Sequence, residues 1–145
     1  MKLLQSNPKI KLVFIGKNNN KKIEKFINKN NLTNIKILGE ISNVQKYYNA
    51  FDLFVFPSIF ESAGLALYES LSNGCPSLAS KYIPLDDLKS ANLVTLDLNE
   101  KIWAEKIINN FNQEKKRKEK CNDDAIPTLD TEIKNYLDLY NKLTK

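Results

Sequence analysis

Histidine is absent from all 145 residues of the sequence, and this absence removes several kinds of chemistry at once. A Ser-His-Asp triad, a Cys-His pair and a zinc site with histidine ligands each require at least one imidazole. Acid–base catalysis or charge stabilisation must therefore come from carboxylates, lysines, tyrosines or the backbone.

Cysteine and long apolar runs are also scarce. The two cysteines, Cys75 and Cys121, lack the close spacing of a metal site and suit a reduced, cytoplasmic setting. Cys75 stands between Gly74 and Pro76 at a helix-to-strand turn, where we expect a small buried side chain. The amino terminus is too short and polar for a signal peptide, and no run approaches the ~20 apolar residues of a membrane span. We expect a cytoplasmic protein, with a peripheral position at the inner face of the membrane as the alternative.

Arginine is nearly absent, since Arg117 is the only one, although the net charge is +5. A nucleic-acid-binding protein usually gathers Arg and Lys on one face and uses Arg to contact base edges. The lysines of this chain are scattered, so we interpret their excess as a compositional bias and expect no nucleic-acid partner. The basic run at residues 115–120 is interpreted as a solvated helix surface.

Short apolar segments alternate with helical patterns along the chain, whose apolar fraction of 42% is ordinary for one globular domain. Strands are predicted at residues 10–15, 35–38, 52–56, 76–79 and 93–96, and helices at 21–31, 42–48, 64–74, 99–111 and 129–143. This alternation predicts an α/β fold with a parallel sheet, in a single domain over residues 1–145 whose last part, 129–145, is a carboxyl-terminal helix.

Capping residues and buried stripes are predicted on several of these helices. Ser42 and Asn43 are expected to cap the helix at 42–48, and Asn99 the helix at 99–111. The residues expected to face inward are Ile102, Trp103, Ile107 and Phe111 on that helix, and Ile133, Tyr136, Leu137 and Tyr140 on the last one.

The candidate site lies where the third strand passes into a helix. The apolar strand ends at Pro57, Glu61 follows in the turn, and Glu69 lies inside a helix that begins near Gly64. In an open parallel sheet, ligands bind beyond the carboxyl ends of the strands. Open backbone N–H groups around Gly64 favour a phosphate, whereas carboxylates suit the neighbouring hydroxyls of a ribose or sugar. The alternative is that Glu61 caps the helix and Glu69 is an ordinary solvated residue.

This segment resembles the signature of the group 1 glycosyltransferases, retaining enzymes of the GT-B type. The signature residues are Pro57, Ser58, Glu61, Gly64, Glu69, Gly74, Pro76 and Ser80, with two glutamates separated by seven residues. Flanking segments at 14–16, 35–41 and 47–52 resemble the family's earlier strand and glycine, its strand-Leu-Gly element and the approach to its signature strand. The resemblance covers about residues 8–112 and implies a Rossmann-like, donor-binding domain.

The resemblance also implies a role for each matching position. Glu61 would contact the donor sugar hydroxyls beside the anomeric carbon, as the catalytic residue, and Glu69 would bind the ribose of a UDP- or GDP-sugar. The remaining donor-binding positions are Ser62, Ala63, Gly64 and Leu65 for the diphosphate, Ile41 for the base, and Gly16. Transfer would proceed with retention to a saccharide or lipid-linked acceptor. No metal and no cofactor besides the nucleotide-sugar substrate is implied, and the family is associated with polysaccharide biosynthesis.

The sequence departs from the family pattern in ways that affect its activity. The family's acceptor-binding domain, its first donor-domain strand and an Arg/Lys pair for the phosphates have no counterpart in the chain. We therefore expect an amino-terminally truncated domain with an unfilled slot between two strands, and little transfer without a separate acceptor-binding domain or chain. Residues 81–87 lack the family's glycine pair, and Ala63 replaces a commoner aromatic, which leaves the sugar open.

Other functions remain as alternatives at this point. The chain could be a non-catalytic module that binds a nucleotide-sugar or only assembles with other proteins, or an inactive fragment of a larger glycosyltransferase. A basic nucleic-acid-binding domain would rest on charge alone. A sugar-nucleotide epimerase of similar architecture is a further rival, which the absence of histidine disfavours.

Overall fold

The structure is a computed structural model that describes residues 2–17, 21–85, 88, 90–112, 133, 134, 137 and 142. The strands are β1 (Leu12–Phe14), β2 (Ile35–Ile37), β3 (Phe54–Phe56), β4 (Ser77–Ser80) and β5 (Leu93–Leu96). The helices are α1 (Lys2–Ser6), α2 (Lys21–Lys29), α3 (Gln45–Ala50), α4 (Leu65–Ser72) and α5 (Glu100–Asn112). Each strand expected from the sequence is present within a few residues of its predicted bounds.

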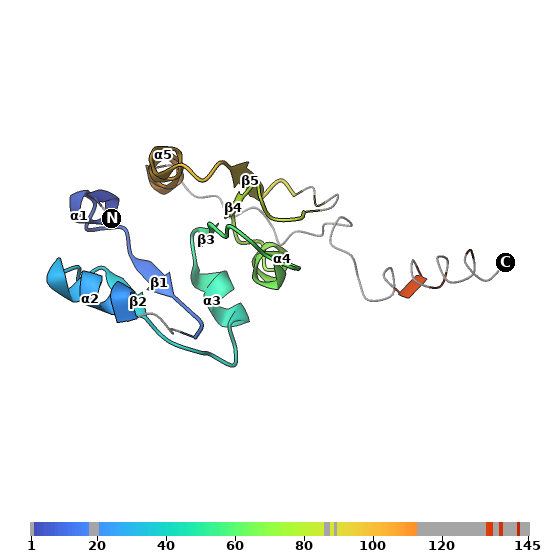
Figure 1. Cartoon of the computed structure of the whole chain (residues 1–145), viewed down its shortest axis with the longest axis horizontal. Helices are drawn as coiled ribbons and strands as arrows, with labels where there is room; N and C mark the ends of the chain where they lie inside the picture. The colour runs from blue at the N-terminus through green and yellow to red at the C-terminus, as the bar shows by residue number, and fades with distance from the viewer. Residues whose placement is uncertain are drawn as a thin grey trace.

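The strands form two parallel sheets that stand apart (Figure 1). β1 pairs with β2, with Leu12 opposite Ile35, and β3, β4 and β5 form the second sheet in that order, with Phe54 opposite Ser77. The predicted α/β fold with parallel strands is therefore confirmed.

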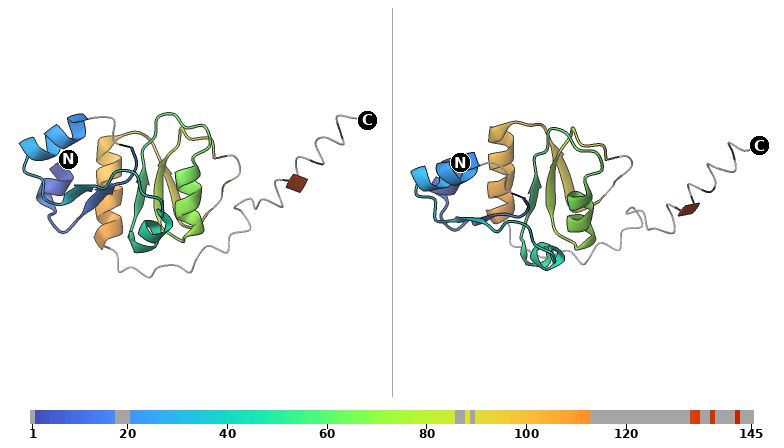
Figure 2. Two further views of the ribbon diagram at one scale, coloured as in Figure 1. Left: turned by 90° about the horizontal axis from the view of Figure 1, so that it is seen from below. Right: turned by 60° about the horizontal axis from the view of Figure 1, so that its bottom comes forward.

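Helices cover both faces of the strands (Figures 1 and 2). α1 and α2 pack on β1 and β2 through Leu4, Ile27 and Ile35, and α5 packs Trp103 on Leu78. α4 packs on the opposite face of the second sheet, where its fully buried side chains contact Phe54, Phe56 and Ala79. The core is thus divided into three clusters, and no described helix is long and apolar enough to cross a membrane.

Two buried serines join α4 to β4. The Ser70 hydroxyl donates to the Leu67 carbonyl at 2.8 Å and lies 2.9 Å from the Ser77 hydroxyl, which donates to the Cys75 carbonyl. Both serines are almost fully buried, so these hydrogen bonds offset the free-energy cost of burying their hydroxyls. Cys75 is also buried, as predicted, and this packing fixes the position of α4 on the sheet.

Several expectations about helix ends and faces are corrected by the structure. Ser42 and Asn43 do not cap α3, because Val44 occupies the capping position and accepts the first helical N–H groups on its carbonyl oxygen. On α5, Trp103 is buried as expected, but Ile102 and Phe111 are both 39% exposed.

Only some of the residues predicted to face inward on the carboxyl-terminal helix can be compared with the structure. Ile133 and Leu137 are exposed and do not face inward, because neither belongs to any of the three core clusters. Tyr136, Tyr140, Cys121 and the basic run 115–120 lie outside the described residues.

The cap on α5 has the predicted form and supports a test of the fold. The Asn99 side-chain oxygen accepts the backbone N–H of Lys101 at 3.0 Å and that of Ile102 at 3.4 Å. Asn99→Ala should lower the free energy of unfolding by about 1 kcal/mol because two helix N–H groups lose their acceptor. Urea unfolding measures the change, and Asn99→Ser should restore most of it. Equal stability of the Ala and Ser variants would contradict this role.

Candidate functional site

The turn from β3 into α4 places Glu61 at the carboxyl edge of the second sheet. Residues 57–64 connect the two elements, and the Ser58 hydroxyl closes part of the turn by donating to the Phe60 carbonyl at 2.7 Å. The Glu61 carboxylate accepts the backbone N–H of Ser62 at 3.1 Å. Glu61 thus stabilises the turn in which it lies. The Ser62 N–H that it binds is one of the groups that the family resemblance assigns to the diphosphate.

Gly64 shapes the amino-terminal end of α4. It has φ of +61°, in the left-handed region, and its carbonyl accepts the N–H of Leu67 at 2.8 Å and that of Tyr68 at 3.3 Å. No side chain caps this helix, so the first N–H groups of α4 point out of the helix end and carry its positive dipole. Such an end can accept an anion.

The backbone conformation at position 64, more than the space around it, requires glycine. A Cβ atom on Gly64 would lie 3.5 Å from the Ile83 side chain and 3.7 Å from that of Glu61, which is ordinary contact. The left-handed backbone is the costly part for any other residue. Ile83 is buried beside Gly64, so it packs beneath the turn although sequence reasoning assigned it no part in the site.

Glu69 is held by a tyrosine that sequence reasoning missed. It lies on α4, is exposed, and accepts a hydrogen bond from the Tyr48 hydroxyl of α3 at 3.3 Å. Tyr48 is only 3% exposed and packs edge-on against the Phe54 ring, with ring centroids 5.5 Å apart. The signal in the sequence is the tyrosine pair Tyr47–Tyr48, of which only the second reaches α4.

Burial, and secondarily the charge of Glu69, raise the pKa of the Tyr48 phenol well above its ordinary value. Tyr48 therefore stays neutral and remains a hydrogen-bond donor across the physiological pH range. The distance of 3.3 Å is long for an O–H···O hydrogen bond, so the bond is weak. The Tyr48 hydroxyl therefore orients the Glu69 carboxylate but does not enclose it. The carboxylate keeps acceptor capacity for a hydroxyl-bearing ligand.

Gly16 and Ile41 lie in the loops that follow the strands of the other sheet, β1 and β2. The Gly16 N–H donates to the Gly39 carbonyl at 2.8 Å, which ties together the chain after β1 and β2. Ile41 follows two residues later and is half-buried. Within the described residues no hydrogen bond or ion pair joins these two positions to Glu61 or Glu69. The predicted site residues therefore fall into two groups, one beside each sheet.

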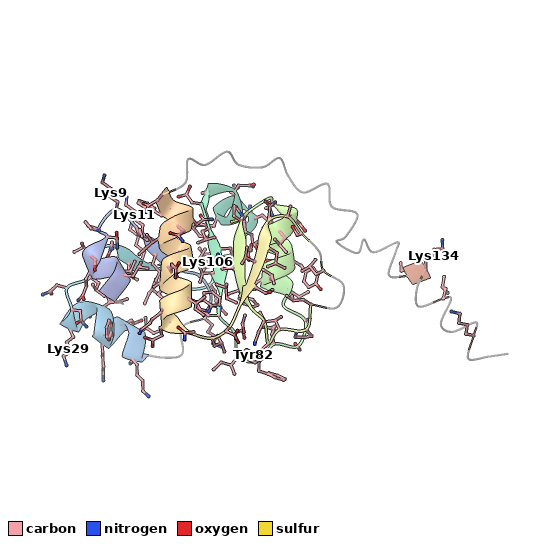
Figure 3. The ribbon with its side chains drawn as sticks, turned by 90° about the horizontal axis from the view of Figure 1, so that it is seen from above. Lys9, Lys11, Lys29, Tyr82, Lys106 and Lys134 are labelled. Carbon is pink, nitrogen blue, oxygen red and sulfur yellow. The ribbon has the colours of Figure 1, made fainter. Side chains whose placement is uncertain are left out.

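Other polar and apolar groups line the same edge of the second sheet. Lys81, after β4, forms an ion pair with Asp97, after β5, and its ammonium lies 5.5 Å from the Tyr82 ring centroid. Figure 3 shows Tyr82 projecting outward from this end of the strands. The hydrogen bond and charge of Asp97 raise the pKa of Lys81, which keeps it cationic. Ile59 and Phe60 of the neighbouring turn are 78% and 85% exposed.

The donor set suits hydroxyls and phosphates. Among the described residues no group of three or more His, Cys, Asp or Glu side chains lies close enough together to bind a metal ion. The groups at the edge are a turn carboxylate, an open helix end and a second carboxylate on the helix, held by a neutral phenol.

Comparison with known families identifies the family of the chain. The family described as "Glycosyl transferases group 1" matches residues 1–125. The chain belongs to the group 1 glycosyltransferase family. No curated protein sequence matches the chain.

Solved glycosyltransferase structures share the fold. The crystal structure of TarM has a TM-score of 0.76 at 24% identity and covers 97% of the chain. Anabaena Alr3699/HepE, solved in complex with UDP, gives 0.62 at 17% identity over 77% of the chain, and the GtfA/B complex gives 0.61 at 24% over 80%. At these identities the likeness shows the GT-B fold alone. The chain spans 30%, 35% and 25% of these three chains, respectively.

The left-handed backbone at Gly64 leads to a testable expectation. Gly64→Ala should lower the free energy of unfolding by about 1–2 kcal/mol, because an L side chain is strained at this φ although space is present. Gly64→Asn should cost less, because asparagine tolerates this region better. Thermal unfolding of both variants measures the difference. An alanine variant as stable as the parent would show that the turn relaxes to another conformation.

Proposed function

We propose that the chain is the donor-binding domain of a glycosyltransferase that transfers a sugar from a UDP- or GDP-sugar, with retention, to a saccharide or lipid-linked acceptor. The observation that carries the proposal is the open end of α4, with Glu61 in the turn before it and Glu69 on its second turn. The helix end, which can bind an anion, lies between two carboxylates that can accept hydrogen bonds from hydroxyls. A nucleotide diphosphate sugar has its groups in the same order, with a diphosphate between the ribose hydroxyls and the sugar hydroxyls.

The diphosphate would bind the backbone N–H groups from Ser62 to Leu65, at the positive end of α4. Without ligand the Ser62 N–H is held by the Glu61 carboxylate, so binding requires this carboxylate to turn away. The donor sugar hydroxyls would then replace the lost N–H group as hydrogen-bond donors to Glu61. The exchange conserves hydrogen bonds and places Glu61 beside the reacting anomeric carbon.

Glu69 would accept the ribose hydroxyls, with Tyr48 as a neutral donor that keeps its carboxylate oriented. Ile41 and Gly16 would border the base from the first sheet. With no metal and no cofactor in the proposed reaction, rate enhancement would rest on positioning the donor and on stabilising the leaving diphosphate. Retention without a protein nucleophile is consistent with this set of groups.

The similar structures support parts of this proposal. Alr3699/HepE was solved with UDP, which favours a uridine nucleotide, and GtfA/B is a complex, which is consistent with an acceptor-binding domain or chain supplied separately. Because the chain spans about a third of such proteins or less, we expect it alone to transfer little or no sugar. The acceptor and a cytoplasmic location, with or without attachment at the inner membrane face, are proposed for the whole protein.

A non-catalytic nucleotide-sugar-binding module is the second candidate, since the same site would bind a donor without turnover. A nucleic-acid partner is not favoured, because its support is the net charge of +5 alone. Addition of an acceptor-binding domain distinguishes the first two functions, because only the enzyme would then release free nucleotide from the donor.

Nucleotide-dependent stability tests the site. UDP or GDP at about 100 times its dissociation constant should stabilise the chain by about 2.7 kcal/mol, and ADP should have little effect. Glu69→Gln should abolish the stabilisation, because a neutral amide accepts ribose hydroxyls poorly. Glu105→Gln, on the exposed side of α5, is the matched control. Thermal unfolding measures all arms, and an equal response of the Glu69 variant and the parent would contradict the proposed ribose contact.

Tyr48 provides a finer test of the same site. Tyr48→Phe should weaken nucleotide binding about five-fold, the value of one modest hydrogen bond, while leaving the fold intact. Tyr47→Phe is the control, since no hydrogen bond joins the Tyr47 side chain to α4. Because the pKa of Tyr48 is raised, the ratio between parent and variant affinities should stay constant from about pH 7 to pH 10. A ratio that falls toward one by pH 10 would mean that the phenol ionises and is not buried against Glu69.

A further inference from the structure

Apolar side chains are exposed together at the carboxyl edge of the second sheet. Among the described residues, the three most exposed large apolar side chains are Phe60, Ile59 and Leu65, and all three lie in the stretch from the turn after β3 to the first residue of α4. Tyr82 is 55% exposed and follows the end of β4 at the same edge (Figure 3). Exposed apolar side chains gathered in one region of a surface indicate a site for a ligand or partner.

Tyr82 is exposed although the chain on both sides of it is fixed. Its backbone N–H donates to the Ser80 hydroxyl oxygen at 3.2 Å, and Ser80 is fully buried. The residue before it, Lys81, donates its N–H to the Leu96 carbonyl of β5 at 3.0 Å, and the residue after it, Ile83, is buried in a core cluster. The backbone therefore presents the Tyr82 ring to solvent from a defined position.

One face of the Tyr82 ring already has a neighbour. The Lys81 ammonium lies over the ring, 5.5 Å from its centroid, and is held by its ion pair with Asp97. A cation at this distance is attracted to the negative face of an aromatic ring. The contact restricts the orientation of the ring and leaves its other face for a ligand.

The turn at Gly64 brings the Tyr82 loop to Glu61. The point where a Cβ atom on Gly64 would lie is 3.5 Å from Cγ2 of Ile83 and 3.7 Å from Cγ of Glu61. The side chains of Ile83 and Glu61 therefore approach the same point, and Tyr82 is the chain neighbour of Ile83. The exposed ring thus follows from the same part of the edge as the carboxylate proposed to bind the sugar hydroxyls.

The order of the strands places Tyr82 toward the sugar end of the proposed donor. β3 is the strand of the second sheet nearest to β1 and β2, so the end of β4 lies farther from the first sheet than the end of β3 does (Figures 1 and 2). A donor whose base is bordered by the first sheet, and whose diphosphate binds at α4, has its sugar directed toward the end of β4.

An aromatic ring and a carboxylate bind different parts of a hexose. The ring form of a hexose carries hydroxyls around its rim, which a carboxylate accepts, and C–H bonds on its two faces. These hydrogens carry partial positive charge and are attracted to the negative face of an aromatic ring, and the contact also removes apolar surface from water. Glu61 and Tyr82 are therefore complementary to the rim and to one face of the same sugar.

We propose that Tyr82 stacks on the donor hexose whose hydroxyls bind Glu61, and that it contributes to the choice of sugar. The inference rests on the proposed function, because it takes the diphosphate to bind at α4. The ring accepts a hexose with an uninterrupted C–H face and disfavours one with an axial substituent on that face.

The affinity that the sugar adds to the nucleotide tests the role of Tyr82. Isothermal titration calorimetry of the 145-residue chain gives the dissociation constants of UDP, GDP, UDP-glucose, UDP-galactose, UDP-N-acetylglucosamine and GDP-mannose. For the sugar that adds most, the ratio of the nucleotide constant to the nucleotide-sugar constant should fall about five-fold in Tyr82→Ala, the value of one aromatic contact. Tyr82→Phe should keep the ratio, and the affinity for the bare nucleotide should not change in either variant.

Phe111→Ala is the matched control for the loss of an exposed aromatic side chain. Phe111 is also exposed, but it lies near the end of α5, which begins after β5 and runs to the opposite edge of the sheet (Figure 2). This variant should bind every nucleotide and nucleotide-sugar as the parent does.

The outcomes separate this inference from the proposed function. If a nucleotide binds but the ratio is the same in Tyr82→Ala and the parent, or if no sugar adds affinity in the parent, the inference is overturned and the nucleotide site stands. An equal loss of affinity for the nucleotide and the nucleotide-sugar would also overturn it, because the ring would then act on the loop and not on the sugar. Absence of binding to every nucleotide by the parent would contradict the proposed function, and the inference with it.

Discussion

Backbone hydrogen bonding between parallel strands is the constraint on which this structure depends. A parallel strand satisfies only half of its N–H and C=O groups with one neighbour and needs a second neighbour for the rest. β4 has two neighbours and is completely buried, whereas β1 and β3 have one each and are only half-buried. The cluster around Leu4 and Ile35 is separate from the other two because, among the described residues, no strand connects the two sheets. The other two clusters lie on opposite faces of the second sheet.

The same geometry creates the candidate site. Parallel strands place their carboxyl ends at one edge, and the passage from β3 to α4 there requires a left-handed residue, which Gly64 supplies. That turn leaves a helix end open toward solvent and sets Glu61 next to it. Packing of α3 against α4 then brings Tyr48 to Glu69, so the second carboxylate is oriented from outside the signature segment. The proposed donor site is in this way assembled mainly on the three-stranded sheet.

Family membership was accessible from one segment of the sequence, because the order of the turn prolines, glycines and glutamates between Pro57 and Ser80 is specific. The parallel α/β architecture was accessible from the alternation of apolar runs and helical stripes, and Asn99 from its place before a helix. Local signals were weaker where tertiary contacts decide the outcome. Val44 displaced Ser42 and Asn43 as the cap of α3, and the exposure of Ile102 and Phe111 depends on which strands lie beneath α5.

What the sequence by itself determined is the set of elements and the chemistry at their junctions, because hydrophobic period, turn residues and caps act within a few residues of each other. Only the tertiary structure decided which of those junctions meet. It joined Tyr48 to Glu69 and turned Glu61 back onto the Ser62 N–H. It also placed Gly16 and Ile41 after the strands of the first sheet, whereas the glutamates follow β3 of the second. Such choices depend on contacts between segments distant in the chain, and local propensity carries no information about which strand neighbours are present.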